Sequence, residues 1–77
     1  MAEILSPLPG TFYMRSAPDA PNYKQVGDSV AIDDVIGLVE VMKMFTEVRA
    51  EVSGKVVRYA IQNEDPVEAG QLLLVVE

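Results

Sequence analysis

The sequence predicts an all-β fold, a small sandwich or barrel formed by a single domain. Turn-forming residues recur at short spacing, and the segments between them are rich in Val, Ile, Leu, Phe and Tyr. No window is long enough and regular enough to show the apolar period of about 3.6 residues that marks a helix. At 77 residues and 49% apolar content, the chain can form one compact core without disulfides or metals.

The turn-forming segments divide the chain into short apolar runs. Each contains Pro, Gly, Asn or Asp, the residues that favour tight turns for defined steric reasons. In chain order they are PLPG (7–10), APDAPN (17–22), VGD (26–28), VSG (52–54), NEDP (63–66) and EAG (68–70). The runs between them are short enough for strands, except for residues 29–51, which Lys43 divides.

An internal repeat predicts two similar halves. Residues 27–40 align without gaps with residues 64–77, an offset of 37 residues, and residues 6–12 align with 50–56 at an offset of 44. The first half therefore carries about seven additional residues, which we place in SAPDAPN (16–22), a segment suited to a projecting loop. Two such halves facing each other bury both apolar faces without a helix.

Lys43 lies between two apolar strands and predicts the tip of a hairpin. The run 35–42 predicts a mostly buried strand. The alternation in 46–52 predicts a strand with one face toward solvent and the other, formed by Thr46, Val48, Ala50 and Val52, toward the core. An ammonium group in a dry core is costly, so Lys43 is expected at or beside the turn. No Asn-Gly or Asp-Gly pair indicates the turn type.

Composition excludes several functions. Neither Cys nor His is present, which removes thiolate metal sites, the commonest general base and an activated serine, so no catalytic or metal-binding residues are predicted. A formal charge of −6 disfavours nucleic acid and anionic membranes as partners. No apolar stretch reaches bilayer length and the start lacks the pattern of a signal peptide, so we expect a soluble cytoplasmic domain that acts through partners.

The sequence Glu40-Val41-Met42-Lys43-Met44 resembles the attachment motif of biotin carboxyl carrier domains, most often Glu-Ala-Met-Lys-Met. The resemblance covers nearly the whole chain, including SPLPGTFY near its start, EVSGKV after the hairpin and DPVEAGQLL near its end. Val41 in place of alanine is a small departure.

This resemblance implies a flattened β-barrel, or barrel-sandwich hybrid, of two quasi-symmetric halves with the modified lysine in an exposed β-hairpin turn. Residues 1–77 would then form one biotinyl domain. GTFYMRSAPDAPNYKQVG (10–27) is similar to the segment that carries a protruding "thumb" in acetyl-CoA carboxylase carriers, which implies a thumb loop at about 14–23. Tyr13-Met14-Arg15-Ser16 departs from the commoner thumb sequence, Tyr-Arg-Ser/Thr-Pro.

The resemblance also implies a non-catalytic carrier of a multi-subunit enzyme of the acetyl-CoA carboxylase type. A biotin protein ligase would join biotin to Lys43, and biotin carboxylase and carboxyltransferase subunits would then use it to carry carboxyl groups toward malonyl-CoA for fatty acid biosynthesis. Met42, Met44, Val41 and Glu40 would contribute to the attachment site, with the methionines read by the partner enzymes.

Two alternatives are compatible with the same strands. A lipoyl carrier shares the architecture but typically has Asp-Lys-Ala at its turn, and an unmodified β-sandwich could serve as an interaction module. The other two lysines, Lys24 and Lys55, lack flanking methionines and are interpreted as surface charges.

Overall fold

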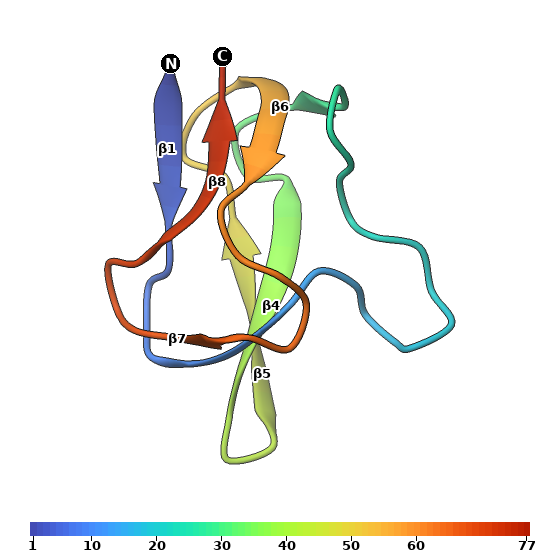
Figure 1. Ribbon diagram of the computed structural model, residues 1–77, viewed down its shortest axis with the longest axis vertical. Coiled ribbons are helices and arrows are strands. Elements are labelled where there is room, and N and C mark those ends of the chain that lie inside the picture. The colour runs from blue at the N-terminus through green and yellow to red at the C-terminus, as the bar shows by residue number, and fades with distance from the viewer.

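The computed structural model describes residues 1–77 and contains strands, turns and loops but no helix, which confirms the all-β prediction (Figure 1). Its eight strands are β1 (Ala2–Leu5), β2 (Gly10–Tyr13), β3 (Ser29–Val30), β4 (Val35–Val41), β5 (Met44–Arg49), β6 (Gly54–Tyr59), β7 (Pro66–Val67) and β8 (Leu72–Val76). The structure therefore has no helix that is long and apolar enough to cross a membrane.

The eight strands form two four-stranded sheets whose orders are related by the sequence repeat. One sheet runs β1-β8-β6-β3 and the other runs β5-β4-β2-β7, and every observed pairing is antiparallel. The two offsets found in the sequence convert β1, β2, β3 and β4 into β5, β6, β7 and β8. Applying this exchange to the first sheet gives the order of the second, so the prediction of two quasi-symmetric halves is confirmed.

Equivalent turns of the two halves use equivalent hydrogen bonds. The Asp28 carboxylate accepts a bond from the Gln25 backbone N–H at 2.8 Å, and the Asp65 carboxylate accepts one from the Gln62 N–H at 3.0 Å. Such bonds from a backbone N–H to an Asp side chain nearby in sequence stabilise a turn locally. The two halves therefore share the hydrogen bonds of these turns as well as the order of their strands.

Two glycines occupy equivalent positions where the chain crosses a neighbouring strand. A Cβ atom added to Gly10 would lie 2.3 Å from the Glu40 carbonyl oxygen, and one added to Gly54 would lie 2.3 Å from the Glu77 carbonyl oxygen. No side chain fits at such a distance, so glycine is required for close backbone approach at both positions. The alignment of residues 6–12 with 50–56 matches Gly10 with Gly54, and the structure places both glycines at equivalent positions of the two halves.

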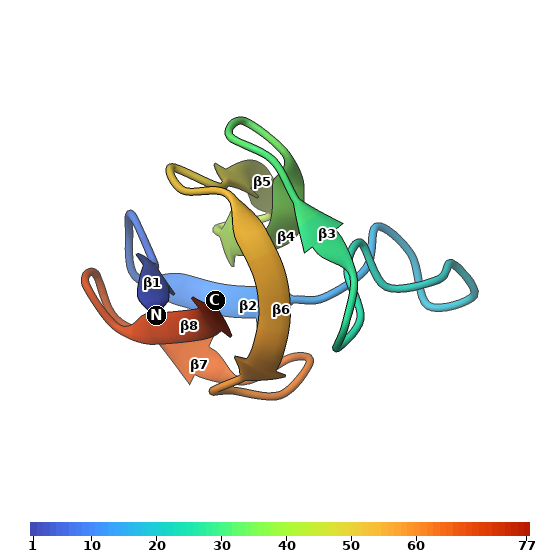
Figure 2. The same cartoon turned by 90° about the horizontal axis from the view of Figure 1, so that it is seen from above.

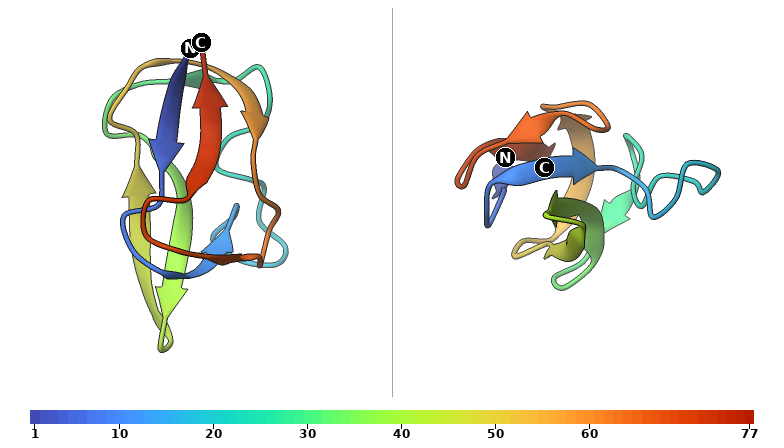
Figure 3. Two further views of the ribbon diagram at one scale, coloured as in Figure 1. Left: turned by 60° about the vertical axis from the view of Figure 1, so that its left-hand side comes forward. Right: turned by 90° about the horizontal axis from the view of Figure 1, so that it is seen from below.

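Both sheets contribute side chains to one apolar core. The largest fully buried side chains are Phe12, Ile36, Leu73, Leu74, Val39, Val48 and Val76. Tyr59 borders this core, and its hydroxyl donates hydrogen bonds to the carbonyl oxygens of Lys24 at 3.0 Å and Ile36 at 3.2 Å. Burial raises the pKa of Tyr59 to about 12 because the charged phenolate would lose hydration. Figure 3 shows the two sheets curling around this interior.

The hairpin formed by β4 and β5 departs from the predicted burial pattern. Val48 and Ala50 are buried as predicted, but Thr46 is exposed, and Val52 lies beyond the end of β5 and is half-buried. The reason is length: the end of the hairpin nearest the turn extends beyond the rest of the fold, so Thr46 lies outside the core (Figure 1). The chain termini lie at the opposite end of the molecule (Figures 1 and 3).

Residues 14–23 form a loop that projects from the side of the molecule (Figure 2). It is closed at its base by a hydrogen bond from the Tyr23 backbone N–H to the Met14 carbonyl at 2.9 Å, and by an isolated bridge between Arg15 and Asn22. The Met14 N–H donates to the Asn63 side chain at 2.7 Å, which ties the loop to the other half of the chain. The projection of this loop follows from the inserted residues rather than from the repeat.

Candidate functional site

Lys43 lies in a two-residue turn at the tip of the β4–β5 hairpin, as expected. Val41 and Met44 form the last cross-strand pair, and the turn residues Met42 and Lys43 have φ angles of 52° and 66°. Positive φ at both central positions is the signature of a type I′ turn, whose twist matches that of the flanking strands. Such turns favour Asn and Gly, and each L residue with a side chain costs about 1–2 kcal/mol in this conformation. Met42 and Lys43 are therefore not the residue types that would make this turn most stable.

The side chains around the turn are unusually exposed for apolar residues. Relative exposure is 91% for Met42, 75% for Met44 and 37% for Val41, and Lys43 is also exposed. The amine of Lys43 takes part in no side-chain hydrogen bond or ion pair. Flexible, polarisable methionine side chains adapt to different partner surfaces. The tip thus presents one free amine between two adaptable apolar side chains.

The other two lysines have different surroundings. Lys24 is half-buried, and its ammonium group bonds to the Asp34 carboxylate at 3.0 Å and to the Ser29 carbonyl at 2.9 Å. Lys24 is therefore a charge at the surface whose ammonium group is held by the ion pair with Asp34. Lys55 is exposed but lies within strand β6, where it pairs in register with Ser29. Only Lys43 combines exposure with a turn at the end of a projecting element.

Glu40 lies two residues before the turn and takes part in a contact that sequence reasoning missed. Its carboxylate accepts a hydrogen bond from the Tyr13 hydroxyl at 3.1 Å, and the Tyr13 ring lies 5.8 Å from the Phe45 ring, centroid to centroid, with the planes inclined by 57°. The bond to Glu40 raises the pKa of Tyr13 above its ordinary value, with smaller contributions from desolvation and from the charges of Glu40 and Glu64. Among the predicted site residues, Glu40 is therefore the one whose side chain is held by the body of the domain.

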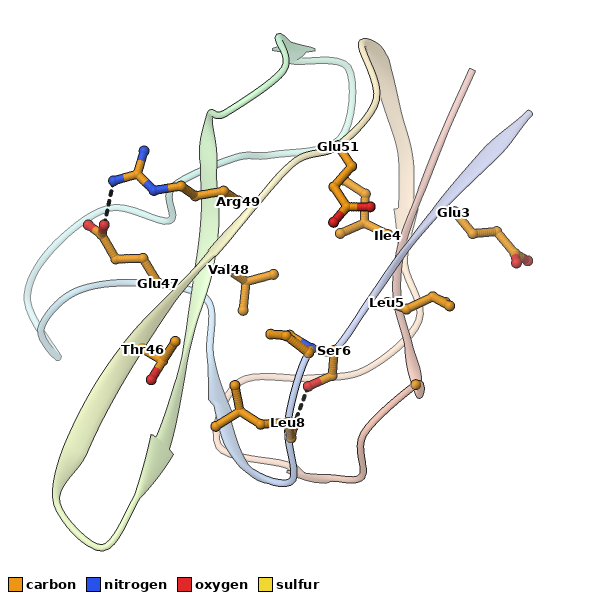
Figure 4. Close-up of a pocket in the computed structure, with 12 residues that line it drawn as sticks. Glu3, Ile4, Leu5, Ser6, Leu8, Thr46, Glu47, Val48, Arg49 and Glu51 are labelled. Carbon is orange, nitrogen blue, oxygen red and sulfur yellow. Dashed lines mark hydrogen bonds and ion pairs between the residues drawn. The ribbon is translucent and has the colours of Figure 1, made fainter.

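A pocket of about 240 Å³ lies between this contact and the 14–23 loop. Its lining comes from three segments: Tyr13, Arg15, Ser16, Ala17, Pro18, Phe45, Asn63 and Glu64. The larger pocket of the molecule, about 560 Å³, lies elsewhere, between the edge strands β1 and β5 (Figure 4). There the Glu47 carboxylate is paired with Arg49 at 2.6 Å, and the Ser6 hydroxyl donates to the Leu8 carbonyl (Figure 4). The Lys43 side chain lines neither pocket.

No group of three or more His, Cys, Asp or Glu side chains is placed to hold a metal ion. The polar groups near the tip are one carboxylate, one phenol and one amine. This set can present a nucleophilic nitrogen to another protein.

The fold and the tip together define a class of protein: a small β domain with two quasi-symmetric halves that presents one lysine amine at the end of a hairpin. Comparison of the sequence with models of known families identifies one family. The model of the family described as "Biotin-requiring enzyme" matches residues 2–76, so the chain belongs to that family. The resemblance found in the sequence is thereby confirmed.

Curated relatives cover nearly all of the chain. The biotin carboxyl carrier protein of acetyl-CoA carboxylase from Chlamydia pneumoniae is 47% identical over 70 residues, which is 91% of this chain and 42% of that protein. The protein of the same name from Pyropia yezoensis is 40% identical over 76 residues, covering 99% of this chain and 48% of the relative. The chain thus spans less than half the length of these two curated relatives.

Solved structures include a close match to the fold. The crystal structure of the Kluyveromyces lactis urea carboxylase superposes with a TM-score of 0.78 and 34% sequence identity. The match covers 99% of this chain and 6% of that much longer one. The predicted architecture is therefore confirmed by a protein of known structure.

Proposed function

We propose that this chain is a biotin carboxyl carrier domain, non-catalytic by itself, and that Lys43 is the residue to which biotin is attached. The observation that supports this assignment most directly is the free amine of Lys43 in an exposed type I′ turn, at the end of the molecule opposite the termini. The family match and the names of the relatives support biotin as the cofactor.

The residues at the tip fit covalent attachment. A biotin protein ligase must bring the Lys43 nitrogen into its own active site, and a projecting two-residue turn lets that nitrogen enter before the body of the domain collides with the ligase. A lysine nitrogen attacks through its lone pair, so the ligase must accept a proton from it as it attacks the activated carboxyl carbon of biotin. The new bond is an amide, and the group activating the carboxyl leaves. Biotin, when bound, supplies a carrier for carboxyl groups.

Four neighbours complete the proposed site. Met42 and Met44 offer apolar surface on either side of the amine, Val41 adds a partly exposed side chain at the base of the turn, and Glu40 holds the hairpin through its bond to Tyr13. Attachment to a tethered arm raises the local concentration of the cofactor at each partner, to about the millimolar range for a short flexible link. The domain itself needs no acid or base for this role.

We further propose that residues 1–77 form one biotinyl domain in which the 14–23 loop corresponds to the thumb of acetyl-CoA carboxylase carriers. The partners would be a biotin carboxylase and a carboxyltransferase, and the parent complex an acetyl-CoA carboxylase that makes malonyl-CoA in the cytoplasm. The names of the relatives support this assignment. The formal charge of −6 agrees with protein partners rather than nucleic acid or an anionic membrane.

Intact-mass measurement tests the attachment. The purified chain, incubated with a biotin protein ligase, biotin and ATP, is expected to gain the mass of one biotinyl group. Lys43→Arg should abolish the gain, whereas the matched change Lys55→Arg should leave it intact. A parallel incubation with a lipoate ligase and lipoate tests the lipoyl alternative. A lipoyl adduct, or no adduct with a ligase that modifies another carrier, would contradict the proposal.

A further inference from the structure

The quasi-symmetry of the fold identifies a contact that only one of the two sheets possesses. At the offset of 44 residues, Tyr13 corresponds to Val57 and Phe45 corresponds to Met1, so the sheet β1-β8-β6-β3 has no equivalent of the Tyr13–Phe45 contact. Glu40 corresponds to Glu77, whose side chain makes no hydrogen bond or ion pair. The equivalent strand order of that sheet is therefore formed without this three-residue cluster. The cluster lies at the end of the domain that carries Lys43.

The cluster spans three adjacent strands directly below the turn. Tyr13 in β2 pairs with Leu38 in β4, so its side chain reaches Glu40 diagonally, two residues further along the same face. Glu40 in turn pairs with Phe45 across the hairpin. One tyrosine therefore contacts both members of a cross-strand pair, through its hydroxyl on one strand and its ring on the other.

This contact ties the end of the hairpin to strand β2 through side chains. Beyond the Glu40–Phe45 pair, the hairpin has only the Val41–Met44 pair and the two turn residues, all of them exposed, with Val41 also lying against Gly10 of β2. Hinge motion of the tip is therefore limited in part by what holds Glu40 and Phe45. Phe45 itself is 59% exposed, so the ring of Tyr13 is an important part of its packing.

We propose that Tyr13 is a positioning residue for Lys43: by holding Glu40 and Phe45 it fixes the direction in which the hairpin presents the amine to the biotin ligase. This inference rests on the proposed function. A ligase that accepts one orientation of the tip binds only the molecules in that orientation. Its apparent Kd for the carrier is therefore the intrinsic Kd divided by the fraction of molecules in the accepted orientation. Tyr13 raises the accepted fraction, so its removal is expected to raise KM for the carrier and leave kcat unchanged.

Initial-rate measurements with the full chain as substrate test the inference. Tyr13→Phe keeps the ring and removes the hydroxyl, and we expect KM for biotin ligase to rise about threefold, a size typical of losing one net hydrogen bond. Tyr13→Ala removes both contacts and should raise KM about tenfold. Backbone amides of residues 42–45 should exchange with solvent faster in both variants.

Two controls separate positioning from stability. Tyr59→Phe removes the same atom from a tyrosine that supports the core, so it should lower the melting temperature and leave KM unchanged. Glu40→Leu removes the partner of the Tyr13 hydroxyl. If Tyr13 acts through Glu40, then adding Tyr13→Phe to Glu40→Leu should change KM no further, whatever Glu40 itself contributes to ligase contact.

The outcomes are distinguishable. An unchanged KM in Tyr13→Ala, with the wild-type chain efficiently biotinylated, would overturn the positioning role and leave the proposed function standing. The same holds if KM rises equally in Tyr13→Ala and Tyr59→Phe, since the effect would then report stability. No biotinylation of the wild-type chain by a ligase that modifies another carrier would overturn the proposed function and the inference with it.

Discussion

Glycine-to-alanine substitutions at three positions test how the two halves are packed. Gly10 has an ordinary φ, but an added Cβ would meet the Glu40 carbonyl oxygen at 2.3 Å and two valine methyl groups at 2.8 and 2.9 Å. Gly27 has a φ of 93° and nothing within 4 Å of an added Cβ. Gly54 combines a φ of 155° with a contact of 2.3 Å to the Glu77 carbonyl oxygen. The three positions thus separate steric contact from backbone strain.

The expected losses of unfolding free energy follow from these distances. Ordinary van der Waals contact begins near 3.4 Å, so Gly10→Ala must move strand β4 or β2 by about 1 Å, and the cost should be about 3 kcal/mol, the upper part of the usual range for overpacking. Gly27→Ala carries a left-handed strain of about 1–2 kcal/mol, partly offset by a stiffer unfolded chain, for a net loss of about 1 kcal/mol. Gly54→Ala has both costs and should lose about 4 kcal/mol.

Urea and thermal unfolding followed by circular dichroism measure these losses. A 77-residue domain has a total stability of about 4–12 kcal/mol, so Gly54→Ala is expected to remove between about a third and all of it. For Gly10→Ala, about 3 kcal/mol corresponds to a fall in melting temperature of about 12–24 °C. If Gly10→Ala costs no more than Gly27→Ala, then close backbone approach is not what requires glycine, and the packing argument for both halves fails.

Three further predictions follow from single residues. Met42→Gly should stabilise the domain by about 0.5 kcal/mol in urea unfolding, because glycine adopts the positive φ of the turn without strain, while biotinylation becomes slower; a loss of stability would contradict the type I′ assignment. Hydrogen bonding from Ala31, followed by the bond from Lys24, lowers the pKa of Asp34 below 3.8, so its contribution to stability is present above that pH and is lost as pH falls further. Asp34→Asn should therefore be less stable at pH 7 and show a shallower acid dependence; an unchanged acid limb would refute this. Burial raises the pKa of Tyr59 from 10.0 to about 12, so stability that is complete below pH 10 should decline between pH 10 and 12, and Tyr59→Phe should weaken that decline.

The strand order could be predicted in large part from the sequence, because the repeat relates one sheet to the other. Once residues 27–40 are aligned with 64–77, any pairing made by β3 or β4 implies an equivalent pairing by β7 or β8. The matching of Gly10 with Gly54 is equally visible in the alignment. The alignment does not show why glycine is needed at these two positions. The Glu40 and Glu77 carbonyl oxygens lie far from Gly10 and Gly54 in the sequence and approach them only in the folded sheets.

The position of Lys43 was predictable because an ammonium group between apolar strands has few places to lie. The turn type was not, since Met42 and Lys43 adopt positive φ without the Asn or Gly that normally indicates it. Residues that break a local rule at an exposed tip are typical of functional sites, where presentation outweighs local stability.

The Tyr13 contacts were missed for a different reason. The residues that meet come from three strands, and their meeting depends on the register Tyr13↔Leu38 and Glu40↔Phe45. A one-residue shift in either register would place the side chains on opposite faces. Comparison of the two halves offers one usable indication, because Tyr13 has no aromatic counterpart at Val57.

Peptide mapping by tandem mass spectrometry tests the central claim most directly. The chain is purified from cells whose ligase biotinylates another carrier, digested, and each of its three lysines is examined for the adduct. The account predicts biotin on Lys43 and on neither Lys24 nor Lys55. An adduct on one of those two lysines, or an unmodified Lys43 beside a fully modified reference carrier, would contradict it.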